Sequence, residues 1–284
     1  NQEIDFTKVS GGLRGEFSFK PGWRYDLHYS FSQSDGSNTT DTWLTTKLAN
    51  TLDLVVAPAG TAANLVRTAG GIDYTCRVNT TTPGEGCIPA PLLTVATIGG
   101  VLPQNWVDYT WRKSTGITLY EESILAFDID GPLFSLPHGD VVAAIGIEHR
   151  SAEIDDTPSI DSINNNLYNL TSATPTRGKD NVTETYAELE VPILKEIPGF
   201  QELTVNVSGR YTDYASYGAD STYKIGAVYS PTEWLSFRGT KGTSYRAPAL
   251  FEQFLGGTSG FLSQQNDPCN NWNAPGVNPI RAFN

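Results

Sequence analysis

The stretch "LRGEFSFKPGWRYDLHYSF", from Leu13 to Phe31, shows the pattern that decides the fold. On both sides of Lys20-Pro21-Gly22, a tripeptide typical of turns, apolar residues or glycine occupy every second position. Polar and charged residues fill most of the positions between them. Period-two alternation on both sides of a turn predicts two antiparallel strands joined as a hairpin. One face of this hairpin is apolar and the other is charged.

The same alternation recurs along the rest of the chain. It covers residues 117–130, 141–150, 184–193, 203–210, 223–229 and 235–240. Together with the first hairpin, this predicts an all-β fold of about eight antiparallel strands. Several reach ten residues or more, whereas strands of globular proteins usually have about five or six. A strand that crosses a membrane needs about nine to eleven, so strand length favours a transmembrane β-barrel.

The connections between these segments alternate in length. Tight ones lie at residues 20–22, 131–140, 195–200 and 230–233, and longer polar ones at 33–109, 152–180, 213–221 and after residue 244. Outer-membrane barrels combine short periplasmic turns with long extracellular loops. A β-sandwich mixes loop lengths at both ends. We therefore predict that residues 1–284 are part of one barrel domain, with extracellular loops at 33–109 and 152–180 and the start of another at 245–284.

The chain is better interpreted as an arc of a larger barrel than as a closed eight-stranded one. Its first loop has about 75 residues, a length that is uncommon unless the loop is functional. The sequence also ends in a polar segment rather than a strand. The alternation from Thr240 through Arg246 predicts that the last strand continues to Pro248, with Arg246 on the lumen side.

The face opposite the apolar one carries charges along most predicted strands. In a soluble sheet these side chains would face water, whereas in a barrel they line the lumen. They are Arg14, Glu16, Arg24, Asp26, Glu122, Asp128, Glu148, Arg150, Glu188, Glu190, Arg210 and Arg238.

Composition excludes some classes of function. The formal net charge of −12 argues against a nucleic-acid-binding protein, whose surface would be basic. The chain begins Asn1-Gln2-Glu3 without the features of a signal peptide, so we interpret it as an internal or processed piece of a longer protein. No run of 18 apolar residues could form a transmembrane helix, but alternating barrel strands score low on hydropathy.

The three cysteines have different surroundings. Cys76 and Cys87 enclose a polar loop with Pro and Gly, which predicts a local disulfide formed in an oxidising compartment. Two unrelated thiols are the alternative. Cys269 lies in "NDPCNNW", and its partner stays open, with a cysteine beyond Asn284 as one candidate. No CxxC occurs and the three histidines are scattered, so we expect no zinc site.

No pattern predicts catalysis or a cofactor. "GTSYRAP" is not the G-x-S-x-G of a nucleophile elbow, and no P-loop or dinucleotide fingerprint is present. Glu188 and Glu190 share a face, but so do any two residues that lie two apart on a strand. The acidic residues Asp155, Asp156 and Asp161 lack regular calcium-loop spacing and are better interpreted as a solvated loop. We therefore expect neither enzyme activity nor a bound metal.

Residues 186–252 carry the most specific resemblance to a known family. Four motifs occur in order: "TYAELEVP" from Thr185, "GRYTDY" from Gly209, "YKIG" from Tyr223 and "YRAP" from Tyr245. Upstream, "DIDGPLFSLPHGDVVAAIGIEHR" is similar to the preceding hairpin of that family, and the segments around Cys76 and Cys87 to its large outer loop. Nearly the whole chain resembles the barrel of TonB-dependent outer-membrane receptors.

The resemblance implies a barrel of about 22 strands, occluded by an N-terminal plug, in the outer membrane of a Gram-negative bacterium. Such receptors capture scarce nutrients, among them siderophores, haem, cobalamin and glycans, and import them with energy delivered by TonB. The implied partners are outer-membrane lipid, the protein's own plug, the TonB complex and an unidentified small-molecule or oligosaccharide ligand. Plug, TonB box and barrel-closing strand are not recognisable here, and we expect them outside these residues.

Two groups of residues are candidates for the receptor's contacts. Function on a rigid scaffold is usually carried by loops, so aromatic and basic residues of the outer loops are ligand candidates, with packing inside their own loop as the alternative. These are Trp43, Tyr74, Arg77, Trp106, Tyr109, Trp111, Tyr168 and Trp272. The lumen-side candidates to contact the plug are Tyr186, Glu188, Arg210, Arg238 and Arg246.

Two other functions remain open from the sequence. One is a small, self-contained porin-like barrel, and the other is a soluble all-β adhesin or carbohydrate-binding module at the cell surface. A preceding plug would distinguish a receptor from a porin, and stability in plain buffer would indicate the soluble module.

Overall fold

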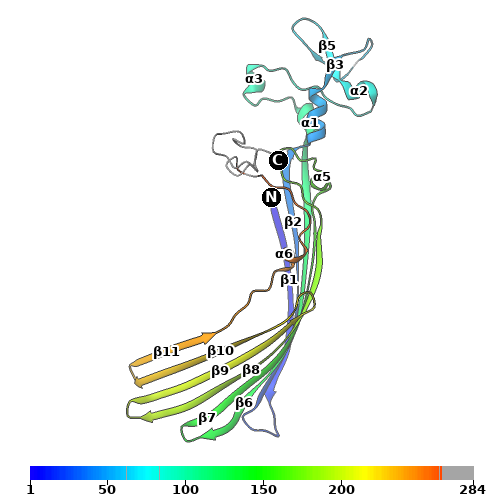
Figure 1. The fold of residues 1–284 in the computed structure, drawn as a ribbon. Coiled ribbons are helices and arrows are strands. Elements are labelled where there is room, and N and C mark those ends of the chain that lie inside the picture. The colour runs from blue at the N-terminus through cyan, green and yellow to red at the C-terminus, as the bar shows by residue number, and fades with distance from the viewer. Residues whose placement is uncertain (62, 83, 262, 264–284) are drawn as a thin grey trace, which may run out of the picture.

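Eight long strands form one curved antiparallel sheet (Figure 1). The structure is a computed structural model that describes residues 1–61, 63–82, 84–261 and 263. The strands follow one another in the order β1-β2-β6-β7-β8-β9-β10-β11, and the sheet is open between β1 and β11. Their bounds are β1 (Gln2–Glu16), β2 (Arg24–Trp43), β6 (Trp111–Leu136), β7 (Gly139–Thr157), β8 (Thr176–Ile197), β9 (Phe200–Tyr214), β10 (Gly218–Thr232) and β11 (Leu235–Gly242). The predicted all-β arc of about eight antiparallel strands is confirmed.

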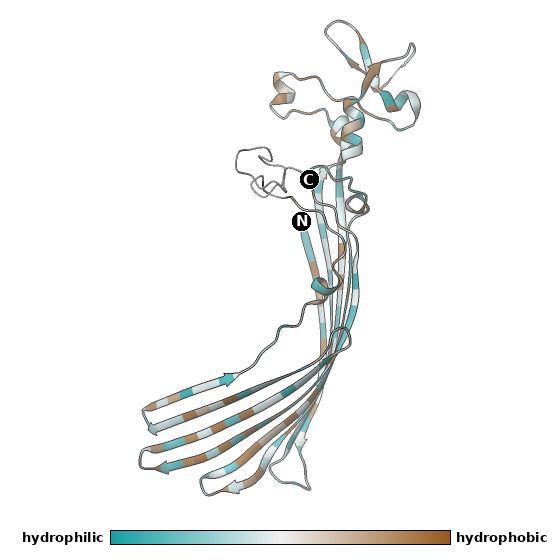
Figure 2. Ribbon diagram, viewed as in Figure 1, coloured by the Kyte–Doolittle hydropathy of each residue, from teal (hydrophilic) through white to brown (hydrophobic). Residues whose placement is uncertain are grey.

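Strand register gives the sheet one polar and one apolar face. In the apolar row, Leu27 lies between Leu13 and Phe127, and Ile147 lies beside Phe127. These side chains remain exposed. Hydrophobic and hydrophilic residues alternate along the lower parts of the strands (Figure 2). An apolar surface of this extent on a sheet marks contact with something other than water. The apolar face is therefore the one suited to lipid.

The apolar face has a limited height. On β6 it reaches from Leu125 to Phe134, nine steps or about 30 Å along the strand, which suits the about 25 Å apolar band of a tilted barrel strand. Above this band the same face carries ion pairs between β7 and β8. Nε of Arg177 lies 2.8 Å from Asp155, and Nζ of Lys179 lies 3.8 Å from Glu153. The upper parts of the strands therefore suit water on both faces.

The strands are longer than the sequence predicted, so two loops are shorter. β2 continues to Trp43, where it pairs with Trp111, and the first loop covers residues 44–110 rather than 33–109. β7 and β8 likewise leave residues 158–175 as the second loop rather than 152–180. The apolar alternation ends where the strands leave the lipid band, but backbone pairing continues without it.

The connection between β9 and β10 was predicted wrongly as one of the long loops. It consists of residues 215–217 alone, although it lies at the same end of the sheet as the long loops. Gly218 follows with a φ of +85°, a left-handed conformation that glycine adopts without strain. The stacked rings of Tyr214 and Tyr217, with centroids 4.4 Å apart, pack across this tight turn.

The end of the last strand was also predicted wrongly. β11 ends at Gly242, and the chain then leaves the sheet instead of pairing as far as Pro248. A short helix follows, α6 (Leu250–Phe254), where the carboxylate of Glu252 accepts a hydrogen bond from the backbone N–H of Ala249 at 2.9 Å. Helix α6 lies on the concave side of the sheet (Figure 1). The described part of residues 245–284 thus folds back over the sheet.

The first loop folds into a small lobe above β2 and β6 (Figure 1). It contains the helices α1 (Thr45–Leu52), α2 (Arg77–Thr81), α3 (Val95–Ile98) and α4 (Gln104–Thr110), and a sheet of β3 (Leu54–Val56), β4 (Val66–Arg67) and β5 (Asp73–Cys76). The predicted Cys76–Cys87 disulfide is confirmed, with Cα atoms 6.1 Å apart. The second loop contains α5 (Ile160–Ile163). No helix among the described residues is long and apolar enough to span a membrane.

The disulfide is reinforced by one side chain. The Asn79 side-chain oxygen accepts a hydrogen bond from the N–H of Cys87 at 2.9 Å, and its amide nitrogen donates to the Cys87 carbonyl at 2.8 Å. Both sulfur-bearing residues are fully buried. Cys269 lies outside the described residues.

Candidate functional site

The polar face of the sheet carries a hydrogen-bonded row across β6, β8 and β9. The hydroxyl of Tyr186 donates to Asp128 at 2.5 Å, and the guanidinium carbon of Arg210 lies 5.2 Å from the Tyr186 ring. Arg210 also donates to Glu184 at 2.9 Å, and the Thr212 hydroxyl donates to the other oxygen of the same carboxylate at 2.7 Å. These contacts hold the side chains in fixed positions on the polar, concave face of the sheet, which we call the wall.

Glycine makes this row possible. β7 runs between β6 and β8, and its Gly146 lies between Asp128 and Tyr186. A Cβ at position 146 would come within 2.2 Å of the Asp128 carboxylate and 2.4 Å of the Tyr186 ring. Without a side chain on β7, the tyrosine reaches across the strand to the carboxylate.

The other residues predicted to face a plug lie in different settings. Glu188 is on the same face as Tyr186 and accepts a hydrogen bond from Asn206. Arg238 pairs in register with Val228 near the open edge. Arg246 is not on a strand, so strand parity does not apply to it. It forms an ion pair with Glu252 at 2.6 Å and borders a pocket together with Thr212 and Tyr214.

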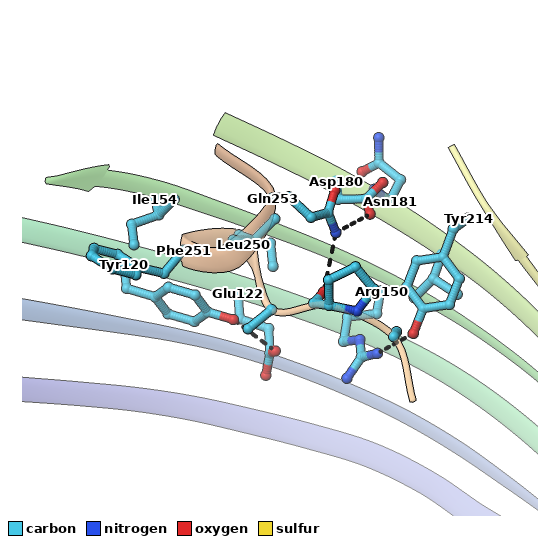
Figure 3. Close-up of a pocket in the computed structure, with 15 residues that line it drawn as sticks. Tyr120, Glu122, Arg150, Ile154, Asp180, Asn181, Tyr214, Leu250, Phe251 and Gln253 are labelled. Carbon is cyan, nitrogen blue, oxygen red and sulfur yellow. Dashed lines mark hydrogen bonds between the residues drawn. The ribbon is translucent and has the colours of Figure 1, made fainter. Parts of the chain in front are cut away.

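A pocket of about 370 Å³ lies between the polar face and the segment that carries α6 (Figure 3). Its wall is formed by β6, β7, β8 and β9, and its cover by residues 247–251 and 253. The lining polar and aromatic side chains of the wall are Tyr120, Glu122, Arg150, Asp180, Asn181 and Tyr214. Of these residues, only Glu122 and Arg150 were predicted from the sequence as lumen charges, and nothing in the sequence brought the six together.

Contacts with β8 and the second loop hold the cover in place. Phe254 fills the space above Gly178, where a Cβ would lie 2.1 Å from its ring. The Gln253 amide donates to Asp180 at 3.3 Å, and the N–H of Gly256 donates to Thr176 at 3.0 Å. A single β-bridge joins Ala173 to Thr258. We call residues 243–259 the strap.

Three of the outer-loop aromatic candidates come together at the top of β2 and β6. Trp43 and Trp111 meet edge to face with centroids 5.2 Å apart, and the ring of Tyr168 lies 6.2 Å from that of Trp43. Trp111 and Tyr168 are well exposed. The indole N–H of Trp43 is buried and has no hydrogen-bond partner among the described residues. By strand register, Trp43 and Trp111 lie on the same face as Leu27 and Phe127, so this aromatic cluster is accessible to a ligand from the outer side of the sheet, above the lipid band, through Trp111 and Tyr168.

Two more candidates lie inside the lobe. The Tyr109 hydroxyl donates to Glu85 at 3.1 Å, and Nζ of Lys47 lies 4.6 Å from the Tyr109 ring and also pairs with Glu85. The hydrogen bond from Lys47 holds the pKa of the Glu85 carboxyl below its usual value, and burial raises the pKa of Tyr109. Trp106 is only 6% exposed, which places it in the packing of the lobe.

The remaining loop candidates are separate from the aromatic cluster. Tyr74 lies in β5 between Val56 and Val66, and Arg77 forms an ion pair with Asp53 at 3.0 Å. Trp272 lies outside the described residues.

A curved sheet with an apolar convex face and a polar concave face is the architecture of one wall of a membrane barrel. A family model described as TonB dependent receptor-like, beta-barrel matches residues 1–284. The chain belongs to the TonB-dependent receptor family. A search of curated proteins finds no match for this receptor. The family consists of transporters of the Gram-negative outer membrane rather than enzymes, so the concave face of this receptor corresponds to a barrel lumen.

Proposed function

We propose that this receptor captures a scarce nutrient at its outer loops and passes it along the concave wall during TonB-energised import. The observation that carries the proposal is the division of the sheet into an exposed apolar convex face and a hydrogen-bonded polar concave face. A siderophore, a glycan, haem or cobalamin would each fit this general role.

Capture is assigned to the aromatic cluster of Trp43, Trp111 and Tyr168. Aromatic faces provide contact area at small conformational cost, and these rings lie on paired strand ends and a loop bound to them. The backbone N–H of Tyr168 donates to the carbonyl of Trp43 at 2.9 Å, which ties the second loop to the end of β2 where the two rings meet.

The wall residues are proposed to hold the plug. Tyr186, Glu188, Arg210 and Arg238 present donors and acceptors toward the concave side, and a plug there would satisfy those that the wall leaves free. Arg246, which lies in the strap, would also contact the plug. The receptor's own plug, the TonB complex and outer-membrane lipid are thus its proposed partners, and the Gram-negative outer membrane its location.

Uptake in cells tests the proposal. Deletion of the gene should abolish growth on, or uptake of, the limiting nutrient, and loss of TonB or an uncoupler should have the same effect. Uptake that persists without TonB would favour the porin-like barrel. A protein found in the soluble fraction without detergent would instead favour the cell-surface binding module.

A further inference from the structure

The pocket beneath the strap continues into a second one. The second pocket has a volume of about 280 Å³ and shares Tyr214 and Pro248 with the first. Together they form a groove between the strap and the concave wall, which we call the strap groove. The two pockets are separate from the aromatic cluster, since neither is lined by Trp43, Trp111 or Tyr168. Pockets that bind small molecules commonly have a few hundred Å³.

Aromatic rings line the strap groove along its length. Tyr120 and Phe251 border the first pocket, and Tyr217 and Tyr245 border the second. Tyr214, stacked on Tyr217, lies where the two meet. A row of rings with hydroxyl groups offers flat apolar faces and hydrogen-bonding edges to the same ligand.

The lining of the groove carries three carboxylates and two guanidinium groups, those of Glu122, Asp180, Asp220, Arg150 and Arg246. Glu122 and Arg150 both face the first pocket, and neither forms an ion pair with a described residue. Each makes one long hydrogen bond to a tyrosine of the groove: Glu122 accepts from the Tyr120 hydroxyl at 3.5 Å, and Arg150 donates to the Tyr214 hydroxyl at 3.5 Å. Asp180 is already bound by Ser216 at 2.7 Å, and Arg246 is bound by Glu252. One carboxylate and one guanidinium outside any ion pair therefore offer strong acceptors and donors, in a groove whose lining has a small excess of negative charge.

The aromatic rings and charged groups of the strap groove together favour some classes of ligand over others. An anionic metal chelate would require uncompensated cations, and a wholly apolar ligand would leave the carboxylates and guanidinium groups of the groove without partners. A neutral ligand with many hydroxyl groups uses both the acceptors of Glu122 and the donors of Arg150, and its less polar ring faces can stack on Tyr214.

We propose that the strap groove is a binding site for a neutral saccharide unit, with Tyr214 as its stacking surface and with Glu122 and Arg150 as its hydroxyl-binding groups. The site deepens the proposed function by naming the substrate class. It relies on that function only in placing the groove on the route from the outer loops to the periplasm.

Calorimetric titration of the complete receptor, purified in detergent, tests the proposal. The probes are maltohexaose, xylohexaose, cellohexaose and laminarihexaose, with ferric citrate as the anionic comparison. We expect saturable binding of at least one neutral hexasaccharide and none of ferric citrate. Glu122→Gln should weaken sugar binding about tenfold, because a charge-assisted hydrogen bond becomes a neutral one.

Matched variants on the same face provide the controls. Glu148 lies on the concave face of β7 and does not line the groove, so Glu148→Gln should bind like the unchanged receptor. Arg150→Gln should weaken binding, whereas Arg14→Gln, on the same face of β1 and outside the groove, should not. The proposal is overturned if no neutral hexasaccharide binds, if ferric citrate binds more tightly, or if Glu122→Gln and Glu148→Gln behave alike.

The two proposals fail in different ways. If the receptor binds no sugar but supports TonB-dependent uptake of another nutrient, the groove proposal is wrong and the proposed function stands. If it binds sugar through Glu122 but uptake does not depend on TonB, the groove stands and the proposed function is wrong.

Discussion

Phe254 of the strap packs directly onto the bare backbone of Gly178 in β8. A Cβ at position 178 would lie 2.1 Å from the phenylalanine ring, a distance that no relaxed structure tolerates. The contact therefore depends on a glycine in the outer part of a barrel strand. It fixes the strap over the concave wall and gives the groove its cover.

Replacing this glycine should release the strap. We expect Gly178→Ala to displace α6 while leaving the barrel assembled, since the strands pair through their backbones. A cysteine introduced at Gln253 should then react several-fold faster with a water-soluble maleimide. Gly209→Ala is the matched control, because a Cβ there would have its nearest contact at an ordinary 3.9 Å. Equal labelling rates in the two variants would contradict the structure.

The hydrogen-bonded row on the wall should contribute to barrel stability. Tyr186→Phe removes one hydrogen bond and should cost about 1 kcal/mol in the free energy of unfolding. Gly146→Ala forces Tyr186 and Asp128 apart and should cost about 1–3 kcal/mol. Urea unfolding of the receptor in lipid vesicles measures both. Because both changes break the same hydrogen bond, the double variant should lose less stability than the sum of the two single losses. Strictly additive losses would argue against the hydrogen bond between Tyr186 and Asp128.

The disulfide should stabilise the lobe rather than the barrel. Replacement of Cys76 and Cys87 by serine opens a link across 11 positions of the chain, and should cost the lobe about 2–3 kcal/mol. Limited proteolysis should then cut within residues 44–110 much faster. The heat-modifiable mobility of the barrel, the gel shift between unheated folded and heated unfolded protein, should stay unchanged. Loss of the folded barrel band would show that the lobe is needed for assembly.

Acid should weaken the lobe through Glu85. Its pKa is lowered in the folded state, so its contribution is fully present above the unfolded-state pKa of about 4.3 and is lost as the pH falls through the lower folded-state pKa. Tryptophan fluorescence or proteolysis of the lobe should show Glu85→Gln less stable than the unchanged receptor at pH 7. The difference should shrink below about pH 4. A difference that grows with acidification would contradict the Lys47–Glu85 pairing.

The antiparallel strands and the division into faces could be predicted from the sequence. That Leu27 and Phe127 lie on one face and Asp26 and Asp128 on the other follows from period-two alternation, because a strand places successive side chains on opposite faces. The short turns and the Cys76–Cys87 pair could also be read, since glycine, proline and local cysteine spacing act over a few residues.

Structural features that depend on residues far apart in the chain could not be predicted from the sequence. Strand pairing from Ser32 to Trp43 has no apolar pattern to reveal it, because both faces lie outside the lipid band. The three-residue turn before Gly218 was hidden by polar residues that are equally typical of a long loop. The strap was missed because its path depends on Gly178, which is 76 positions from Phe254 in the chain.

The sequence by itself determined an antiparallel arc with one lipid-facing side, because that property repeats every two residues along each strand. Only the tertiary structure decided that the chain after β11 turns inward, that Tyr186 reaches Asp128 across Gly146, and that Glu122, Arg150 and Tyr214 share one groove. Register and curvature bring these residues together from separate strands, and no local pattern encodes contacts between side chains so far apart in the chain.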